Sequence, residues 1–156
     1  MNFEYFPGEK IVLNGIPINF GTERASVREM IGERFTANDL EFEFEDITIV
    51  QRRDIYRDIN GTTNYFFTGY NANDELESLE LHQCETVAVS GVRFTFNDLF
   101  DEVSNKLLTI DASRVTDHEE TIFPALKLII KSDRQVGGEA DVLGYLYCAI
   151  DHISND

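Results

Sequence analysis

Three histidines and two cysteines are the side chains in this sequence best suited to bind a transition metal. A zinc site needs three or four such ligands at short spacings, as in CxxC or HExxH. His118 and His152 stand alone, and only His82 and Cys84, two residues apart on a predicted strand, could point the same way. Two ligands do not make a site, so we expect no metal and no bound cofactor.

Nucleophilic catalysis would need a serine or cysteine on a strained turn beside a base. The sequence has no GxSxG motif, and Cys148 lies within an apolar run that predicts a buried, inert thiol. Gly137 and Gly138 lack the flanking residues of a phosphate-binding loop. We therefore expect a protein that is not an enzyme; the alternative is a ligand-binding or catalytic α+β domain with a pocket between sheet and helices.

Carboxylates are the most abundant groups that could carry a function. Among 156 residues, 29 are acidic and 13 basic, which gives a net charge of −16. A binder of nucleic acid or of an anionic membrane needs the opposite balance, so neither is an expected partner. No apolar run approaches the roughly 20 residues that span a bilayer. Without a visible signal segment or a disulfide pattern, we expect a reduced, cytoplasmic protein.

The acidic residues are concentrated in one third of the chain. Residues 39–90 hold 12 acids and three bases, a balance of −9. Within them, residues 40–45 read Leu-Glu-Phe-Glu-Phe-Glu. Alternate residues of a strand lie on one side, about 7 Å apart. We therefore expect Glu41, Glu43 and Glu45 to form a ladder on one face while the aromatic residues are buried on the other.

This acidic strand has two interpretations. It is either a solvated sheet face, in which Arg53 and Arg57 pair with some of the acids, or an anionic docking surface for a basic protein. Fixed carboxylates could imitate the phosphates that a nuclease binds, and exposed tyrosines could anchor the interface. The candidate partner-binding residues are Glu41, Glu43, Glu45, Asp46, Tyr56, Asp74 and Glu75.

Alternation and turn residues predict an α+β fold: antiparallel meander sheets with short helices. Helices are expected from Thr22 to Gly32 and from Thr95 to Leu107, with each threonine as the N-cap. Asn60-Gly61 predicts a two-residue hairpin turn. The expected strands are 40–45, 47–59, 62–70, 76–81, 86–94, 107–115, 123–131 and 142–150.

A short segment recurs 76 residues along the chain. Gly15–Phe20 aligns without gaps on Gly91–Phe96, and in the same register Val27 falls on Val103. Two interpretations stay open: a tandem duplication, or two unrelated strand-to-helix transitions of the same local type. We predict a single domain over residues 1–156, which the first interpretation divides into similar halves, about 11–90 and 91–156.

The first copy also resembles a known group of domains. Asn19-Phe20-Gly21-Thr22, followed by Val27 and Ile31-Gly32 and then by aromatic strands, is similar to the opening of repeats in β-lactamase-inhibitor-protein-like domains. The resemblance implies a short helix before a meander sheet, often in tandem, whose sheet face grips a partner protein. In composition the chain is similar to bacterial immunity proteins, which neutralise toxins, many of them basic nucleases.

These observations favour an acidic, protein-binding inhibitor. We expect an immunity protein that occludes the active site of a basic cognate toxin with the surface around Glu41, Glu43 and Glu45. A homo-oligomeric assembly subunit, in which aromatic strands pair between copies, is a further alternative.

Overall fold

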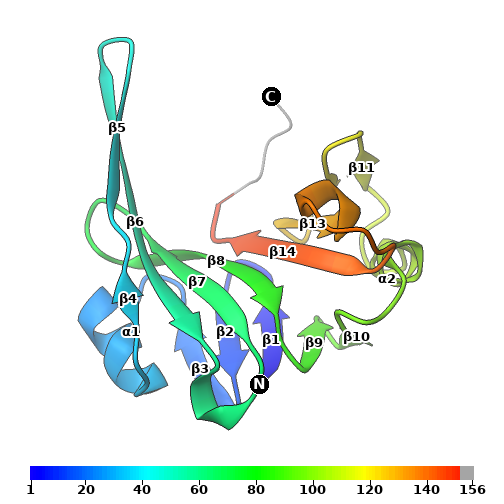
Figure 1. Cartoon of the computed structure of the whole chain (residues 1–156), viewed down its shortest axis with the longest axis horizontal. Helices are drawn as coiled ribbons and strands as arrows, with labels where there is room; N and C mark the ends of the chain where they lie inside the picture. Colours follow the sequence, from blue (N-terminus) through cyan, green and yellow to red (C-terminus); the bar gives the residue numbers. More distant parts are fainter. Residues whose placement is uncertain (152–156) are drawn as a thin grey trace.

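A computed structural model describes residues 1–151 of the chain as a sheet-dominated α+β fold with two short α-helices (Figure 1). The elements, in chain order, are β1 (Asn2–Phe6), β2 (Lys10–Leu13), β3 (Ile16–Asn19), α1 (Arg24–Ile31), β4 (Thr36–Ala37), β5 (Leu40–Phe44), β6 (Ile47–Arg57), the 3-10 turn η1 (Ile59–Gly61), β7 (Tyr65–Tyr70), β8 (Leu76–Gln83), β9 (Thr86–Val89), β10 (Val92–Phe94), α2 (Phe100–Leu108), β11 (Val115–Thr116), β12 (Thr121–Phe123), β13 (Leu128–Ser132), the 3-10 turn η2 (Arg134–Val136) and β14 (Leu143–Ala149).

The strands form two sheets. The smaller sheet has the order β10-β9-β1-β2-β3, and its β1–β9 pair is the one parallel pair among the described strands. The larger sheet has the order β11-β12-β13-β14-β8-β7-β6-β4, and β5 pairs with β6 beyond this path. The pairing of β14 with β8 joins a meander of the second half to a meander of the first, so the larger sheet is continuous.

One hydrophobic core lies against the inner face of the larger sheet. Alternate residues of β7, β8 and β14 point into it, among them Phe66, Leu79 and Leu146, each fully buried. The smaller sheet contributes Phe3 and Tyr5, and the Tyr5 hydroxyl donates a hydrogen bond of 2.8 Å to the Leu126 carbonyl. Because the core is on this side, the opposite face of the larger sheet is left open.

The repeated segment has the same local conformation in both places. Each copy is a hairpin with a two-residue turn in the left-handed region, with φ of 49° and 81° at Asn14-Gly15 and 47° and 84° at Ser90-Gly91. Each continues into a helix, α1 or α2, preceded by a single antiparallel bridge, Glu23 to Glu75 or Leu99 to Val142. The two hairpin–helix segments are alike in element order, which both interpretations of the repeat accommodate.

The expected helix starts are wrong by a few residues. The N-cap positions are Glu23 and Leu99, and neither side chain makes a capping hydrogen bond. The residue before each helix is instead held by its bridge, while the Thr22 hydroxyl donates to the Asn19 carbonyl. The end of α1 is as predicted, because Gly32 adopts the left-handed conformation (φ 67°).

Four further predictions of local structure are wrong. Residues 86–94 and 123–131 are each expected as one strand, but each contains a turn: residues 90–91 join β9 to the antiparallel β10, and residues 124–127 join β12 to the antiparallel β13.

The other two errors concern loops. Residues 107–115 are not a strand: Leu107 completes the buried stripe of α2, and the loop that follows is tied by the buried Asp111, whose carboxylate accepts from the backbone N–H groups of Ser113 and Ala125. Residues 58–64 form a longer loop through η1 in place of a two-residue hairpin, because the Asn64 side chain bonds the backbone of Ile59 on both sides.

Candidate protein-binding face

A two-stranded arm projects from the edge of the larger sheet (Figure 1). We call residues 40–50, formed by β5 and the first part of β6, the arm. Every residue of the arm is exposed. Its strands pair in the register Phe42 to Ile49 and Phe44 to Ile47, so these four apolar side chains share one face. Phe44 is 67% and Ile47 64% exposed, and the expectation that the aromatic residues of this strand are buried is therefore wrong.

The acidic ladder occupies the other side of the arm. Glu41 and Glu43 alternate with the apolar residues of β5, and Glu45 and Asp46 form the turn at the tip. The arm carries no basic residue, and none of its four acids makes an ion pair within residues 1–151. The arm is thus a ribbon with one apolar face, one acidic face and an acidic tip.

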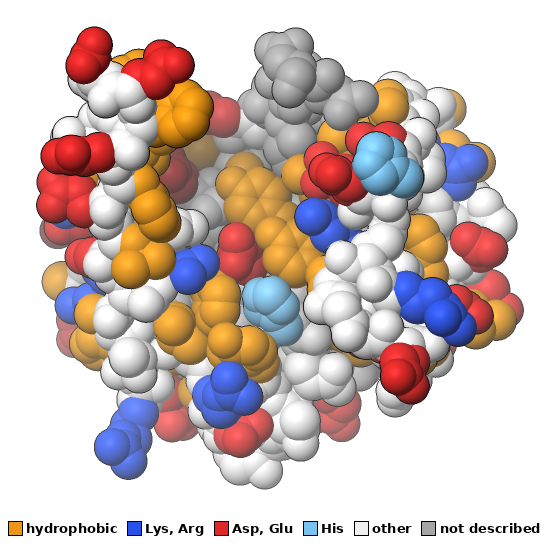
Figure 2. Space-filling view, turned by 45° about the horizontal axis from the view of Figure 1, so that its top comes forward, with side chains coloured by type: hydrophobic (Ala, Val, Ile, Leu, Met, Phe, Trp, Pro, Cys, Tyr) orange, Lys and Arg blue, Asp and Glu red, His pale blue; other side chains and the backbone are white. Residues whose placement is uncertain are grey.

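A groove of about 450 Å³ lies between the arm and the open face of the larger sheet. Figure 2 shows this side of the molecule as a hollow lined by apolar side chains, with the arm on the left. Phe42, Ile49 and Val50 contribute the arm side of the groove, and Arg52 and Arg53 of β6 lie at its base. On β7, β8 and β14 the lining includes Phe67, Gly69, Glu77, Ser78, Glu80 and Tyr147.

The centre of the open face is a cluster of four rings. We call Tyr65, Phe67, His82 and Tyr145 the aromatic platform; the His82 ring centroid is 5.1, 5.0 and 5.3 Å from the other three in that order. His82 Nε2 is buried and has no hydrogen-bond partner, and the nearest carboxylate oxygen, on Glu80, is 3.8 Å away. Burial raises the pKa of the Tyr145 hydroxyl, so this phenol is neutral.

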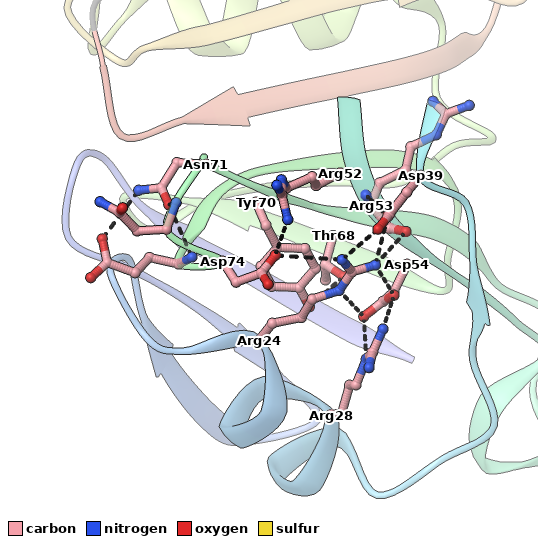
Figure 3. Close-up of polar contacts among 12 residues, drawn as sticks. Arg24, Arg28, Asp39, Arg52, Arg53, Asp54, Thr68, Tyr70, Asn71 and Asp74 are labelled. Atoms are coloured by element: carbon pink, nitrogen blue, oxygen red, sulfur yellow. Dashed lines mark hydrogen bonds and ion pairs between the residues drawn. The ribbon is translucent and has the colours of Figure 1, made fainter. Parts of the chain in front are cut away.

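Charged residues at the base of the arm hold it to helix α1 (Figure 3). Asp54, on β6, is fully buried and accepts two hydrogen bonds from Arg28, at 2.7 and 2.8 Å, and two from Arg24, at 2.7 and 3.4 Å. Arg24 also donates two hydrogen bonds, of 2.8 and 3.1 Å, to the carboxylate of Asp39, the residue before β5. Bidentate arginine–carboxylate pairs fix orientation as well as distance, so α1 sets where the arm begins.

The protonation states of this cluster follow from its geometry. Burial by itself would raise the pKa of Asp54, but the hydrogen bonds from Arg28 and Arg24 outweigh it, and the pKa lies below its usual value. The hydrogen bonds from Arg24 lower the pKa of Asp39 in the same way. Both carboxylates are therefore charged at neutral pH, and their negative charge is matched by the two arginines.

The structure groups some of the predicted partner-binding residues and separates others. Glu41, Glu43, Glu45 and Asp46 lie together on the arm: Glu41 and Glu43 alternate on β5 as the ladder required, whereas Glu45, with a φ of 56°, belongs to the turn and not to the strand. Asp74 and Glu75 lie in the turn before β8, where Asp74 pairs with Arg52 at 3.3 Å and Glu75 accepts from Asn71. Tyr56 is a correction: its ring is fully buried and stacked on Phe66, so it cannot touch a partner.

The sequence reasoning missed the groove and the aromatic platform. The sequence does contain an indication of them: on each of three neighbouring strands, two such residues stand two positions apart. The two-residue period of a strand places the members of each pair on the same face. These pairs are Tyr65 and Phe67, Glu80 and His82, and Tyr145 and Tyr147. Which of the two faces would stay open depended on where the smaller sheet packs.

The residues examined for metal binding and catalysis lie apart. Within residues 1–151, no three His, Cys, Asp or Glu side chains are grouped in a way that could hold a metal ion; His152 lies outside the described residues. Both cysteines are buried free thiols, and burial raises the pKa of Cys84 to about 12 and raises that of Cys148 as well. The two α-helices described, of eight and nine residues, are too short to cross a membrane.

Comparison of the chain with protein-family models, with curated proteins and with solved structures gave no match.

Proposed function

We propose that this protein is a stoichiometric inhibitor that binds a basic partner protein through the arm and the adjacent groove. The observation that carries the proposal is the apolar face of the arm. Phe42, Phe44, Ile47 and Ile49 are each about half exposed or more. Burial of apolar surface is favourable by about 25 cal/mol per Å², and contiguous exposed patches on folded proteins commonly mark interaction sites.

The charge around this apolar face selects the kind of partner. Four acids without basic neighbours surround it on the arm, within a chain of net charge −16. A basic partner would be attracted over several ångströms before contact, which speeds association, while acidic proteins would be repelled. The expected interface has an apolar centre on the partner and lysines or arginines at its rim.

An immunity protein fits these requirements best. The partner would then be a toxin, with a nuclease as the leading class, because the carboxylates of the arm could take the place of nucleic-acid phosphates. The arm would cover or enter the active site and exclude the substrate. Two buried cysteines without a disulfide suit the cytoplasm, where such an inhibitor would act. A tandem origin of the two halves, as in β-lactamase-inhibitor-protein-like domains, belongs to the same proposal.

The test uses the product of the gene immediately upstream, produced in a bacterial host with and without this chain. We expect the upstream product to be basic and toxic, this chain to restore growth, and the two to copurify in a 1:1 complex. The double variant Phe44→Ser/Ile47→Ser removes the apolar tip of the arm and should weaken the complex by about 100-fold, as for loss of central interface residues.

A matched control separates the arm from general surface effects. Ile16→Ser/Met30→Ser also removes two exposed apolar side chains, 41% and 44% exposed, from β3 and α1. It should leave the affinity unchanged. An upstream product that does not bind, or a complex that tolerates both double variants equally, would contradict the proposal.

Self-association is the second candidate, because the same apolar face could pair with that of another copy. The acids of two arms would then approach one another, which opposes assembly at low salt. A stable dimer in light scattering that dissociates in Phe44→Ser/Ile47→Ser would favour this reading over binding of a basic partner.

A further inference from the structure

We infer that the groove between the arm and the sheet receives an arginine side chain of the partner protein. This inference rests on the proposed function and specifies what the groove recognises. It depends on three features of the groove: aromatic walls, two carboxylates without close ion pairs, and resident arginines that are already engaged.

The floor of the groove is closely packed. Gly69 on β7 lies opposite Ser78 on β8, and both line the groove. A Cβ atom built on Gly69 would stand 2.1 Å from the Ser78 hydroxyl oxygen, so this hydroxyl fills the space that a side chain at residue 69 would take. The backbone amides of these two residues therefore lie at the floor, where they can report on a ligand in the groove.

Aromatic rings flank a carboxylate in the next row of the sheet. Phe67, Glu80 and Tyr147 are direct cross-strand neighbours on β7, β8 and β14. Their side chains stand side by side on the open face. Arg53 already lies over the Phe67 ring. A further planar cation placed here could stack on the Tyr147 ring while donating hydrogen bonds to the carboxylate of Glu80.

The two carboxylates of the groove are under-used in the free protein. Glu80 is 3.8 Å from both Arg53 and His82, which is beyond hydrogen-bond length. Glu77 makes no ion pair within the described part of the chain, and burial, with Asp151 nearby, raises its pKa. A cation of the partner would stabilise both carboxylates, because it would supply the positive charge and the hydrogen-bond donors that the fold itself does not supply.

The two arginines that line the groove are held by other groups. Arg52 pairs with Asp74 at 3.3 Å, and Arg53 donates a hydrogen bond of 2.7 Å to the Asn38 side chain while it stacks over the Phe67 ring. Neither arginine forms an ion pair with Glu77. The free faces of the groove thus match a further guanidinium, whose planar fork fits two carboxylates and a ring better than the compact ammonium of lysine does.

The test uses small probes with the full-length protein. N-acetyl-arginine amide, N-acetyl-lysine amide and N-acetyl-citrulline amide are titrated while the backbone amide signals of Gly69 and Ser78 are followed by NMR. Citrulline has nearly the shape of arginine without the charge. We expect saturable shifts with arginine and a Kd on the order of millimolar, at least fivefold weaker binding of lysine, and none of citrulline.

Isosteric variants locate the site. Glu77→Gln/Glu80→Gln should abolish arginine binding, whereas Glu102→Gln/Glu139→Gln removes the same charge from two exposed positions that do not line the groove and should leave it unchanged. Equal binding of citrulline, equal binding of lysine, or equal loss in both double variants would overturn the inference, and the wild-type titrations decide it even if a variant fails to fold. Because Phe44 and Ile47 do not line the groove, a partner that binds through the arm tip while arginine does not bind would leave the proposed function intact.

Discussion

The arm and the hairpin from Val115 to Phe123 each follow a short α-helix and lie toward opposite edges of the larger sheet. Each belongs to the first hairpin after a helix, and β4 and β11 are the two outermost strands along the larger sheet. The second hairpin is closed by a short turn in which Asp117 accepts the backbone N–H groups of Glu119 and Glu120, and its Ile122 is buried. The arm extends outward and leaves its apolar face in solvent. The second half also exposes single apolar side chains, among them Leu99 and Val136, but these are not paired across two strands on one face as the four of the arm are.

The two helices that precede these hairpins, α1 and α2, also differ in what their side chains contact. Helix α2 packs through Val103 and Leu107, both fully buried, and thereby serves the core. Helix α1 buries Val27 but directs Arg24 and Arg28 to Asp54, and Arg24 to Asp39 at the start of the arm. A charged cluster fixes direction more tightly than apolar packing does, because its hydrogen bonds have preferred angles. The first half is therefore built to aim the arm, and the second half to complete the core.

Removal of Asp54 should have the largest effect on stability. Asp54→Ala leaves Arg28 without its carboxylate partner and leaves Arg24 with Asp39 and Asp74 only. Loss of one partner of a buried ion pair costs about 3–5 kcal/mol. Urea unfolding would measure the free energy of unfolding. Glu29→Ala, which removes an exposed acid from the same helix, is the control and should change it by less than about 0.5 kcal/mol. A small effect of Asp54→Ala would mean that α1 is held chiefly by apolar contacts, like α2.

Truncation of the apolar stripe of α2 should come next. Leu107→Ala leaves a cavity in the core and should cost about 2–4 kcal/mol in the free energy of unfolding. Binding of the partner should be unaffected where the protein is folded, since α2 does not line the groove. A loss of affinity at a temperature where the variant is fully folded would show that the second half contributes to the interface.

Acid should remove the stabilisation that Asp54 and Asp39 supply. The folded-state pKa values of Asp54 and Asp39 lie below the ordinary value of 3.8. Their contribution to stability is complete above that value and is lost as the pH falls from it toward the folded-state pKa values. Thermal unfolding from pH 6 to pH 2.5 should show this loss in the wild type. In Asp54→Ala the part due to Asp54 should be absent, and an identical pH profile would contradict the assignment.

Changes in the arm should have the smallest effect on stability. Phe44→Ser/Ile47→Ser removes side chains that touch solvent, so the free energy of unfolding should change by less than about 0.5 kcal/mol. The same double variant is expected to weaken partner binding strongly. A large loss of stability would show that the arm belongs to the core and would remove the contrast between the two hairpins.

Local patterns in the sequence were enough to predict several features of the fold. Alternation of Leu40 to Glu45 correctly indicated a strand with acids on one face, and Gly32 correctly marked the end of α1. The antiparallel strands of the larger sheet were mostly located, and the α+β class followed from them. The first strand, β1, was not predicted, although Phe3 and Tyr5 alternate with Glu4, because a single short alternation can be read only when its neighbours are known.

The amino-acid sequence by itself determined which side chains share a face, since that depends only on the two-residue period of a strand. It also determined the excess of negative charge. The tertiary structure alone decided which faces are covered: the smaller sheet and the helices pack on one side of the larger sheet, so that Tyr56 is buried and Phe42 and Phe44 are exposed. Burial depends on contacts between residues far apart in the chain, and the local period of a strand carries no information about them.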